Sequence, residues 1–127
     1  MTQLKDNNLD ANTLSQQFAE DQRSEYQPME LLTYRIAKWA EDRNITAEGG
    51  ATSYTQIPKL IEEVYEFRDA ETEEEAKLEF GDILVVCIQI ARLRGLDMVE
   101  CLDLAYNKIK TRKGRIIDGR FVKEENL

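Results

Sequence analysis

Two groups of acidic side chains within residues 56–94 have the spacing to hold one cation between them. The first group is Glu62, Glu63 and Glu66, and the second is Glu79 with Asp82. Residues three or four apart on a helix share a face, so Glu63 with Glu66 and Glu79 with Asp82 can each act as a pair. The sequence therefore offers four carboxylates as oxygen ligands for one object.

The second pair lies on the side of its helix that a small protein normally buries. At about 100° per residue, Glu79 and Asp82 share a stripe with Ile83, Val86 and Ile90. Carboxylates that are crowded in a partly dry place repel one another and lose hydration, so they need a compensating cation. The pattern predicts a divalent metal site.

The residue types that are missing narrow the choice of metal. The chain contains no histidine and two cysteines, which disfavours structural zinc. An all-oxygen site suits Mg²⁺, Mn²⁺ or Ca²⁺. Mg²⁺ is the leading candidate, because carboxylates usually bind it together with substrate phosphates, and Mn²⁺ is its expected substitute.

Composition limits the function classes further. A chain of 127 residues with 42% hydrophobic and 33% charged residues is typical of one soluble globular domain. Its net charge of -8 argues against a nucleic-acid polymer as partner. No apolar run approaches the roughly 20 residues that span a membrane, and the first ten residues lack signal-peptide features. We therefore expect a cytoplasmic protein with no membrane contact.

Hydrophobic periodicity predicts an all-α, four-helix bundle-like fold. Residues 1–27 form a polar N-terminal lead-in that we expect to be partly mobile, and residues 28–127 form a single helical domain. The predicted helices cover residues 28–43, 55–70, 73–94 and 97–111. Thr55 is the expected N-cap of the second helix, with Pro58 in its first turn. Thr72 and Glu75 match a capping box, and Gly95 ends the third helix.

The faces of these helices predict how the acids are presented. Ile57, Leu60, Ile61 and Val64 form the apolar stripe of the second helix, which leaves the first acidic group at the flank and on the opposite side. The third helix is apolar nearly all round, which predicts an obligate homo-oligomer with this helix near the interface.

After the fourth helix, the chain has a turn signal and its main positive patch. Asp118-Gly119 lies between two short β-type runs, which predicts a hairpin at about residues 115–122. The polar and basic residues that precede or enter it admit two interpretations, a complement to the helix dipole or a clamp for phosphate groups. They are Asn107, Lys108, Lys110, Arg112, Lys113 and Arg115.

These motifs together resemble a known family. IEEVYE followed by EFGD is similar to the Glu-Glu-x-x-Glu and Glu-x-x-Asp signature of the MazG-like all-α nucleoside triphosphate pyrophosphohydrolases. The resemblance extends from the first helix to AYNKIKTRKGR, so it joins both acidic groups to the basic stretch.

The resemblance implies a Mg²⁺-dependent enzyme that works as a homodimer or homotetramer. It cleaves ribo- or deoxynucleoside triphosphates between the α and β phosphates, giving a monophosphate and pyrophosphate. The implied metal ligands are Glu63, Glu66, Glu79 and Asp82. The implied catalytic acids are Glu62 and Glu63, where the unligated one orients or deprotonates water. The expected substrate-binding residues are Lys59, Tyr54, Asn107, Lys110, Arg112 and Arg115.

Two other functions stay open on the sequence. A phosphoribosyl-ATP pyrophosphohydrolase-like enzyme differs in not consuming plain nucleoside triphosphates. A non-enzymatic acidic helical interaction module differs in lacking stabilisation by Mg²⁺. For Tyr54, a base-stacking role and a packing role are equally compatible with the sequence.

Overall fold

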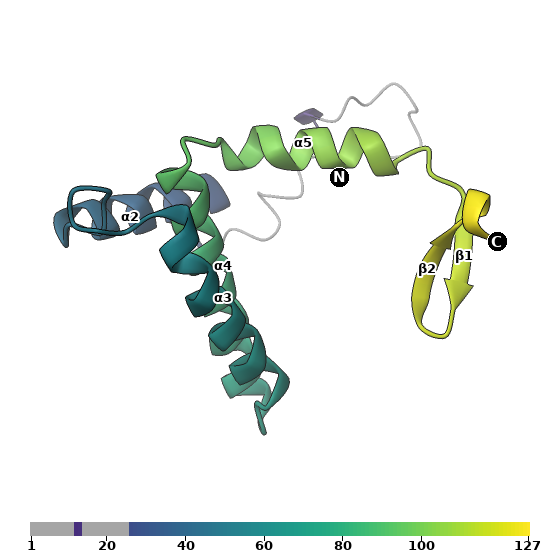
Figure 1. The fold of residues 1–127 in the computed structure, drawn as a ribbon, viewed down its shortest axis with the longest axis horizontal. Helices are drawn as coiled ribbons and strands as arrows, with labels where there is room; N and C mark the ends of the chain where they lie inside the picture. The colour runs from purple at the N-terminus through teal and green to yellow at the C-terminus, as the bar shows by residue number, and fades with distance from the viewer. Residues whose placement is uncertain (1–11, 14–25) are drawn as a thin grey trace. The chain divides into compact units, whose positions relative to one another are not determined.

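Four α-helices, a two-stranded antiparallel hairpin and a closing 3₁₀ turn are formed over residues 26–127 (Figure 1). The structure is a computed structural model that describes residues 12–13 and 26–127. In chain order, the elements are α2 (Met29–Asp42), α3 (Ser53–Arg68), α4 (Glu73–Leu93), α5 (Met98–Ile109), β1 (Gly114–Ile117), β2 (Arg120–Lys123) and η1 (Glu124–Asn126). The prediction of a helical protein with a short C-terminal hairpin is confirmed.

The chain divides into two compact units, with the boundary between Asn44 and Ile45. The first unit contains α2, and the second contains the helices and strands that follow. A single domain over residues 28–127 stays a prediction. The predicted mobility of the lead-in at residues 1–27 concerns residues that, except for 12–13 and 26–27, lie outside the described part of the chain.

α2 begins directly after a proline. Pro28 is the N-cap with φ of -57°, and its carbonyl accepts a hydrogen bond from the Leu32 backbone N–H at 3.0 Å. Because proline has this φ fixed by its ring and lacks a backbone donor, it fits the start of a helix. The helix ends at Asp42, where Arg43 is the C-cap and Asn44 adopts a left-handed φ of 57°. The predicted range of 28–43 is thus correct to one residue at each end.

α3 begins two residues before its predicted N-cap. Thr52 is the N-cap, and it forms a capping box in which the Thr52 hydroxyl accepts from the Thr55 N–H at 3.1 Å. In return, the Thr55 hydroxyl accepts from the Thr52 N–H at 2.8 Å. The prediction of Thr55 as N-cap is wrong because Thr55 is the second partner of the box. Pro58 therefore lies inside the helix, beyond its first turn.

α4 has the two ends that its sequence predicts. The Thr72 hydroxyl accepts from the Glu75 N–H at 3.1 Å, while the Glu75 carboxylate accepts from Glu71 N–H, one residue before the expected position. At the other end Gly95 has φ of 69°, and Leu96 N–H donates to the Ala91 carbonyl at 2.8 Å. This is the Schellman arrangement, which favours glycine. None of the described helices is long and apolar enough to cross a membrane.

α3 and α4 lie side by side and form the packed centre of the second unit (Figure 1). Val86, Ile88 and Ala91 of α4 are buried, and the rings of Phe67 and Phe80 pack with their centroids 5.4 Å apart. The prediction that the apolar stripe of α3 forms its buried face is wrong. Three of its members are at least two-fifths exposed, and the buried side chains of this helix are Ser53 and Glu63.

The last part of the chain is exposed. α5 is capped by Asp97, whose carboxylate accepts from Val99 N–H at 2.9 Å, and it has no buried residue. In the hairpin, Gly114 pairs with Lys123 and Ile117 with Arg120. The connecting residues Asp118 and Gly119 have φ of 51° and 77°. Two consecutive positive φ values are those of a type I′ turn, as Asp-Gly predicts.

Candidate metal and nucleotide site

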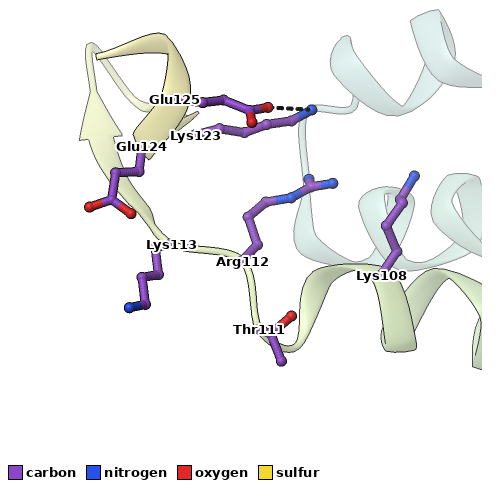
Figure 2. A pocket seen from close by; sticks show the side chains of 7 residues that line it. All are labelled: Lys108, Thr111, Arg112, Lys113, Lys123, Glu124 and Glu125. Carbon is purple, nitrogen blue, oxygen red and sulfur yellow. Dashed lines mark ion pairs between the residues drawn. The ribbon is translucent and has the colours of Figure 1, made fainter.

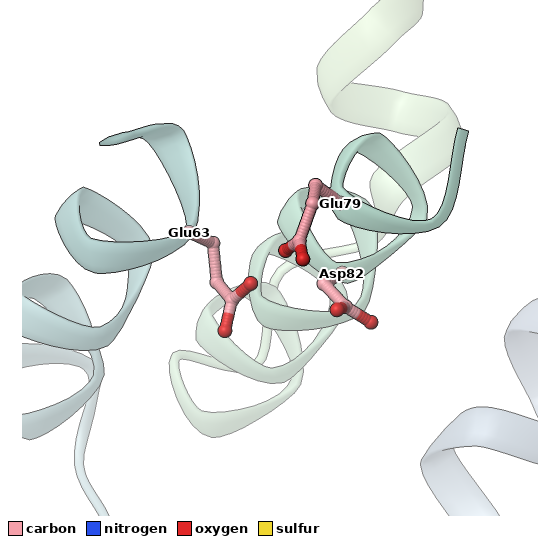
Figure 3. Close-up of side chains that lie close together, drawn as sticks. All are labelled: Glu63, Glu79 and Asp82. Atoms are coloured by element: carbon pink, nitrogen blue, oxygen red, sulfur yellow. The ribbon is translucent and has the colours of Figure 1, made fainter. Parts of the chain in front are cut away.

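Three carboxylates from α3 and α4 come together where the two helices pack. Glu63 extends from α3 toward Glu79 and Asp82 of α4 (Figure 3). One oxygen from each of the three side chains lies within 4.8 Å of the others. Within the described residues this is the one group of three or more potential ligand side chains. Glu63 of the first predicted acidic group therefore lies beside both residues of the second group.

The burial of these carboxylates is what distinguishes them from surface acids. Glu63 is 5% exposed, and Glu79 and Asp82 are half-buried. The Oε2 atoms of Glu63 and Glu79 are both buried without a hydrogen-bond partner. A buried carboxylate oxygen that has lost water and gained nothing destabilises the fold, whereas a cation between the oxygens satisfies them. The residues present thus fit a hard divalent cation with oxygen ligands.

Glu66 lies at the edge of the same group. Its side chain is exposed, and its pKa is raised, first by a side-chain hydrogen bond with Glu79 and then by partial desolvation and the charge of Glu63. Two carboxyl groups share a hydrogen bond when one of them keeps a proton. Glu66 therefore interacts with Glu79 at the edge of the group, and its predicted role as a fourth ligand stays a prediction.

Glu62 and Lys59 occupy the outer side of α3. The ammonium of Lys59 lies 2.9 Å from Glu63 Oε1 and 3.5 Å from Glu62 Oε2. The hydrogen bond to Glu63 is the largest cause of a raised Lys59 pKa. Glu62 is exposed and belongs to the same ion pair, outside the group of three. The sequence placed Glu62, Glu63 and Glu66 on the flank, which is wrong for Glu63, because α4 packs over it.

A basic pocket of about 360 Å³ lies between the end of α5 and the hairpin (Figure 2). Of the predicted basic patch, the pocket includes Lys108, Lys113 and the half-buried Arg112. The other residues that line it are Thr111, Lys123, Glu124 and Glu125. Four cationic side chains against two acidic ones suit an anionic ligand.

Three predicted substrate-binding residues near this pocket make other contacts. Asn107 donates a hydrogen bond to Asp103 at 3.2 Å, and the Lys110 ammonium lies 6.0 Å from the Tyr106 ring centroid. Arg115 is in β1, opposite Val122. Their predicted roles stay predictions. Sequence reasoning missed Lys123, which the hairpin brings to the pocket. The signal that could have found it is the Asp-Gly turn, because its register places Lys123 opposite Gly114.

The comparison with protein families identifies the chain. The MazG nucleotide pyrophosphohydrolase domain matches residues 51–117, which is more than half of the 127 residues. The chain belongs to the MazG family. It is therefore a hydrolase that acts on nucleotide phosphoanhydride bonds. The matched segment of the MazG domain contains both acidic groups and ends with β1, so Lys123 lies outside it.

A solved structure agrees with this assignment at the level of the fold. It is the cyanophage S-2L MazG-like pyrophosphohydrolase bound to dGDP and three catalytic Mn²⁺ ions per active site. The two chains are 24% identical with a TM-score of 0.62, and the match covers 78% of this chain and 97% of that one. The comparison with curated proteins gave no match.

Tyr54 is placed at the start of the MazG segment, in the first turn of α3, and is 81% exposed. An exposed aromatic ring on a well-capped turn is free to stack on a ligand, and no packing role accounts for it within the described residues. Stacking on a nucleobase stays a prediction for this residue.

Proposed function

We propose that this MazG protein is a Mg²⁺-dependent nucleoside triphosphate pyrophosphohydrolase. It cleaves ribo- or deoxynucleoside triphosphates between the α and β phosphates, and it releases a nucleoside monophosphate and pyrophosphate. The observation that carries the proposal is the pair of buried, unpartnered oxygens on Glu63 and Glu79, next to Asp82. A cation bound between the two helices would satisfy these oxygens. Its positive charge would also offset the negative phosphates of the substrate.

The metal ligands in this proposal are Glu63, Glu79 and Asp82, with Glu66 completing the set. Mg²⁺ held there supplies positive charge that offsets the phosphate oxygens and favours attack by water. The Mn²⁺ ions of the cyanophage enzyme support a site for divalent ions, and Mn²⁺ is expected to replace Mg²⁺ here. The all-oxygen donor set suits either ion.

Glu62 is the proposed group that orients the attacking water. It is exposed and lies outside the group of three carboxylates, so it keeps an oxygen available for a proton. Glu63 was the alternative in the sequence, but its burial and its contact with Lys59 favour the ligand role. Neutralisation of the β and γ phosphates falls to Arg112 and the lysines that line the basic pocket.

Two substitutions test the proposal. Glu63→Gln and Asp82→Asn keep the shape of each side chain and remove its charge, so each is expected to lower pyrophosphate release at least about a hundredfold. The assay uses a panel of ribo- and deoxynucleoside triphosphates and phosphoribosyl-ATP, with Mg²⁺ and with EDTA. Circular dichroism checks that each variant is folded.

Glu74→Gln is the matched control. Glu74 is on the same helix as Asp82, is exposed and pairs with Lys77 at 3.3 Å, so its removal should leave turnover unchanged. Undiminished turnover in both site variants, or turnover in EDTA equal to that in Mg²⁺, contradicts the proposal. Turnover of phosphoribosyl-ATP alone contradicts the substrate class.

A further inference from the structure

Lys59 makes an ion pair that differs from the other ion pairs on the described helices. Its partner Glu63 has a side chain that is 6% exposed, whereas Lys59 itself is half-exposed. In the pairs Lys38–Asp42 and Lys77–Glu74, both side chains are more than half exposed. Exposed pairs contribute little because water competes for both partners. A charged hydrogen bond to a buried carboxylate is stronger, because water does not replace it.

The two oxygens of the Glu63 carboxylate have different surroundings. Oε1 lies 2.9 Å from the Lys59 ammonium, while Oε2 is buried and has no partner. The terminal torsion of a glutamate is broad, so the carboxylate plane is not fixed by its rotamer. A contact with one oxygen fixes the plane and thereby the direction of the other oxygen. Glu63 extends toward Glu79 and Asp82 in this orientation (Figure 3).

We infer that Lys59 is a positioning residue, which holds Glu63 by Oε1 so that Oε2 stays available for a divalent cation. The inference rests on the proposed function, because it takes Glu63 as a metal ligand. It assigns Lys59 a role that acts through Glu63, in place of the direct substrate contact predicted from the sequence. Lys59 is four residues before Glu63 on α3, so helix geometry alone keeps the two side chains in register.

The contact has a predictable effect on metal affinity. Groups that hydrogen-bond to metal ligands typically change affinity by about 10- to 100-fold when they are removed. Removing Lys59 leaves both Glu63 oxygens without a partner, so the carboxylate is free to turn away from Glu79 and Asp82. A merely structural ion pair affects stability and leaves the affinity of the folded protein for the ion unchanged.

In the test, the full chain is titrated with Mn²⁺ in the absence of nucleotide, and binding is measured by calorimetry and from the Mn²⁺ EPR signal. Lys59→Met should weaken Mn²⁺ binding at least about tenfold, and Lys59→Arg, which retains a charged donor, should restore most of it. Lys59→Gln, which keeps a polar group, serves if the Met variant fails to fold. The matched control is Lys77→Met on α4, whose partner Glu74 is exposed, and its Mn²⁺ affinity should equal that of the wild type.

The outcomes separate this inference from the proposed function. If the wild-type chain binds no Mn²⁺, both fail. If it binds Mn²⁺ and Lys59→Met binds it equally or more tightly, the inference alone is overturned, since Lys59 is then a competitor of the ion or a bystander. A raised KM for nucleotide with unchanged Mn²⁺ affinity also overturns it, because that result indicates direct contact with the substrate.

Discussion

The pair α3–α4 buries polar side chains as well as apolar ones, whereas α5 buries no side chain at all. The helix pair buries the charged Glu63 and the amide of Gln89, both at or below 5% exposure. α5 exposes Val99 and Leu102 at 64% each and has no buried residue. Both arrangements cost free energy within one chain, because charge loses hydration in the first and apolar surface stays in water in the second.

The contrast indicates that the two regions need different binding partners. The acids of the helix pair require a cation, which we assign to the metal site. On α5, Val99, Leu102, Tyr106 and Ile109 recur at intervals of three and four residues, which is the seam of a packed helix. An exposed seam of this kind fits a second copy of the chain, so we expect α5 to add to the oligomer interface that the apolar helix at residues 73–94 predicts.

The largest expected effect follows from breaking that seam. Leu102→Lys puts a charge in the middle of the stripe and should weaken self-association by about 3 kcal/mol, roughly a hundredfold, because a leucine is lost and an ammonium is desolvated. Light scattering coupled to size exclusion should show the molar mass falling to that of one chain.

Glu100→Lys is the control for this prediction. It introduces a lysine on the same helix, one position after Val99 and off the stripe, so the mass should stay that of the oligomer. A wild-type chain that is monomeric at micromolar concentration contradicts the prediction, because no second copy then covers α5. A Leu102→Lys chain with unchanged mass also contradicts it, because the oligomer then does not use α5.

The end of α4, the hairpin turn and the inward side of α4 could be predicted from local sequence. The end of α4 was predicted from Gly95 and the turn from Asp118-Gly119, because these residues adopt backbone conformations that few others tolerate. Glu79 and Asp82 were placed on the inward side of α4, and they are half-buried beside Glu63. Periodicity sufficed here because both residues belong to one strongly periodic helix.

Two of the features that sequence reasoning missed depend on contacts between elements. Glu63 is buried because α4 covers it, although the α3 stripe of Ile57, Ile61 and Val64 favoured a different face. Those three side chains stay partly exposed, so hydrophobicity alone did not identify the face that packs. Lys123 joins the basic pocket through strand register. Single-helix patterns carry no information on which neighbour covers a face.

The next prediction compares the same valine-to-alanine substitution on α4 and on α5, and the expected effect on stability is smaller. Val86→Ala removes two methyl groups from a side chain that is 6% exposed on α4, and it should lower the free energy of unfolding by about 2 kcal/mol. Val99→Ala on exposed α5 should stay within about 0.5 kcal/mol. Both are measured by urea unfolding at a protein concentration at which light scattering shows a monomer. Equal losses for the two variants contradict the assignment of the core to the helix pair.

The smallest expected effect concerns the basic pocket. Of the residues that line the pocket, Arg112 is half-buried, whereas the lysines are exposed. The Arg112 guanidinium therefore has less freedom to move away from a bound anion than the lysine ammonium groups have. Arg112→Ala should raise the KM for a nucleoside triphosphate about fivefold, equivalent to about 1 kcal/mol, with kcat little changed, because a partly solvated charge contributes modestly and equally to ground and transition states. Arg120→Ala removes the same side chain from β2, outside the pocket, and should leave KM unchanged. Equal effects of the two substitutions on KM would mean that the overall positive charge of this region attracts the nucleotide, without a specific contact from Arg112. A fall in kcat for Arg112→Ala alone would mean that the Arg112 guanidinium stabilises negative charge that develops during cleavage.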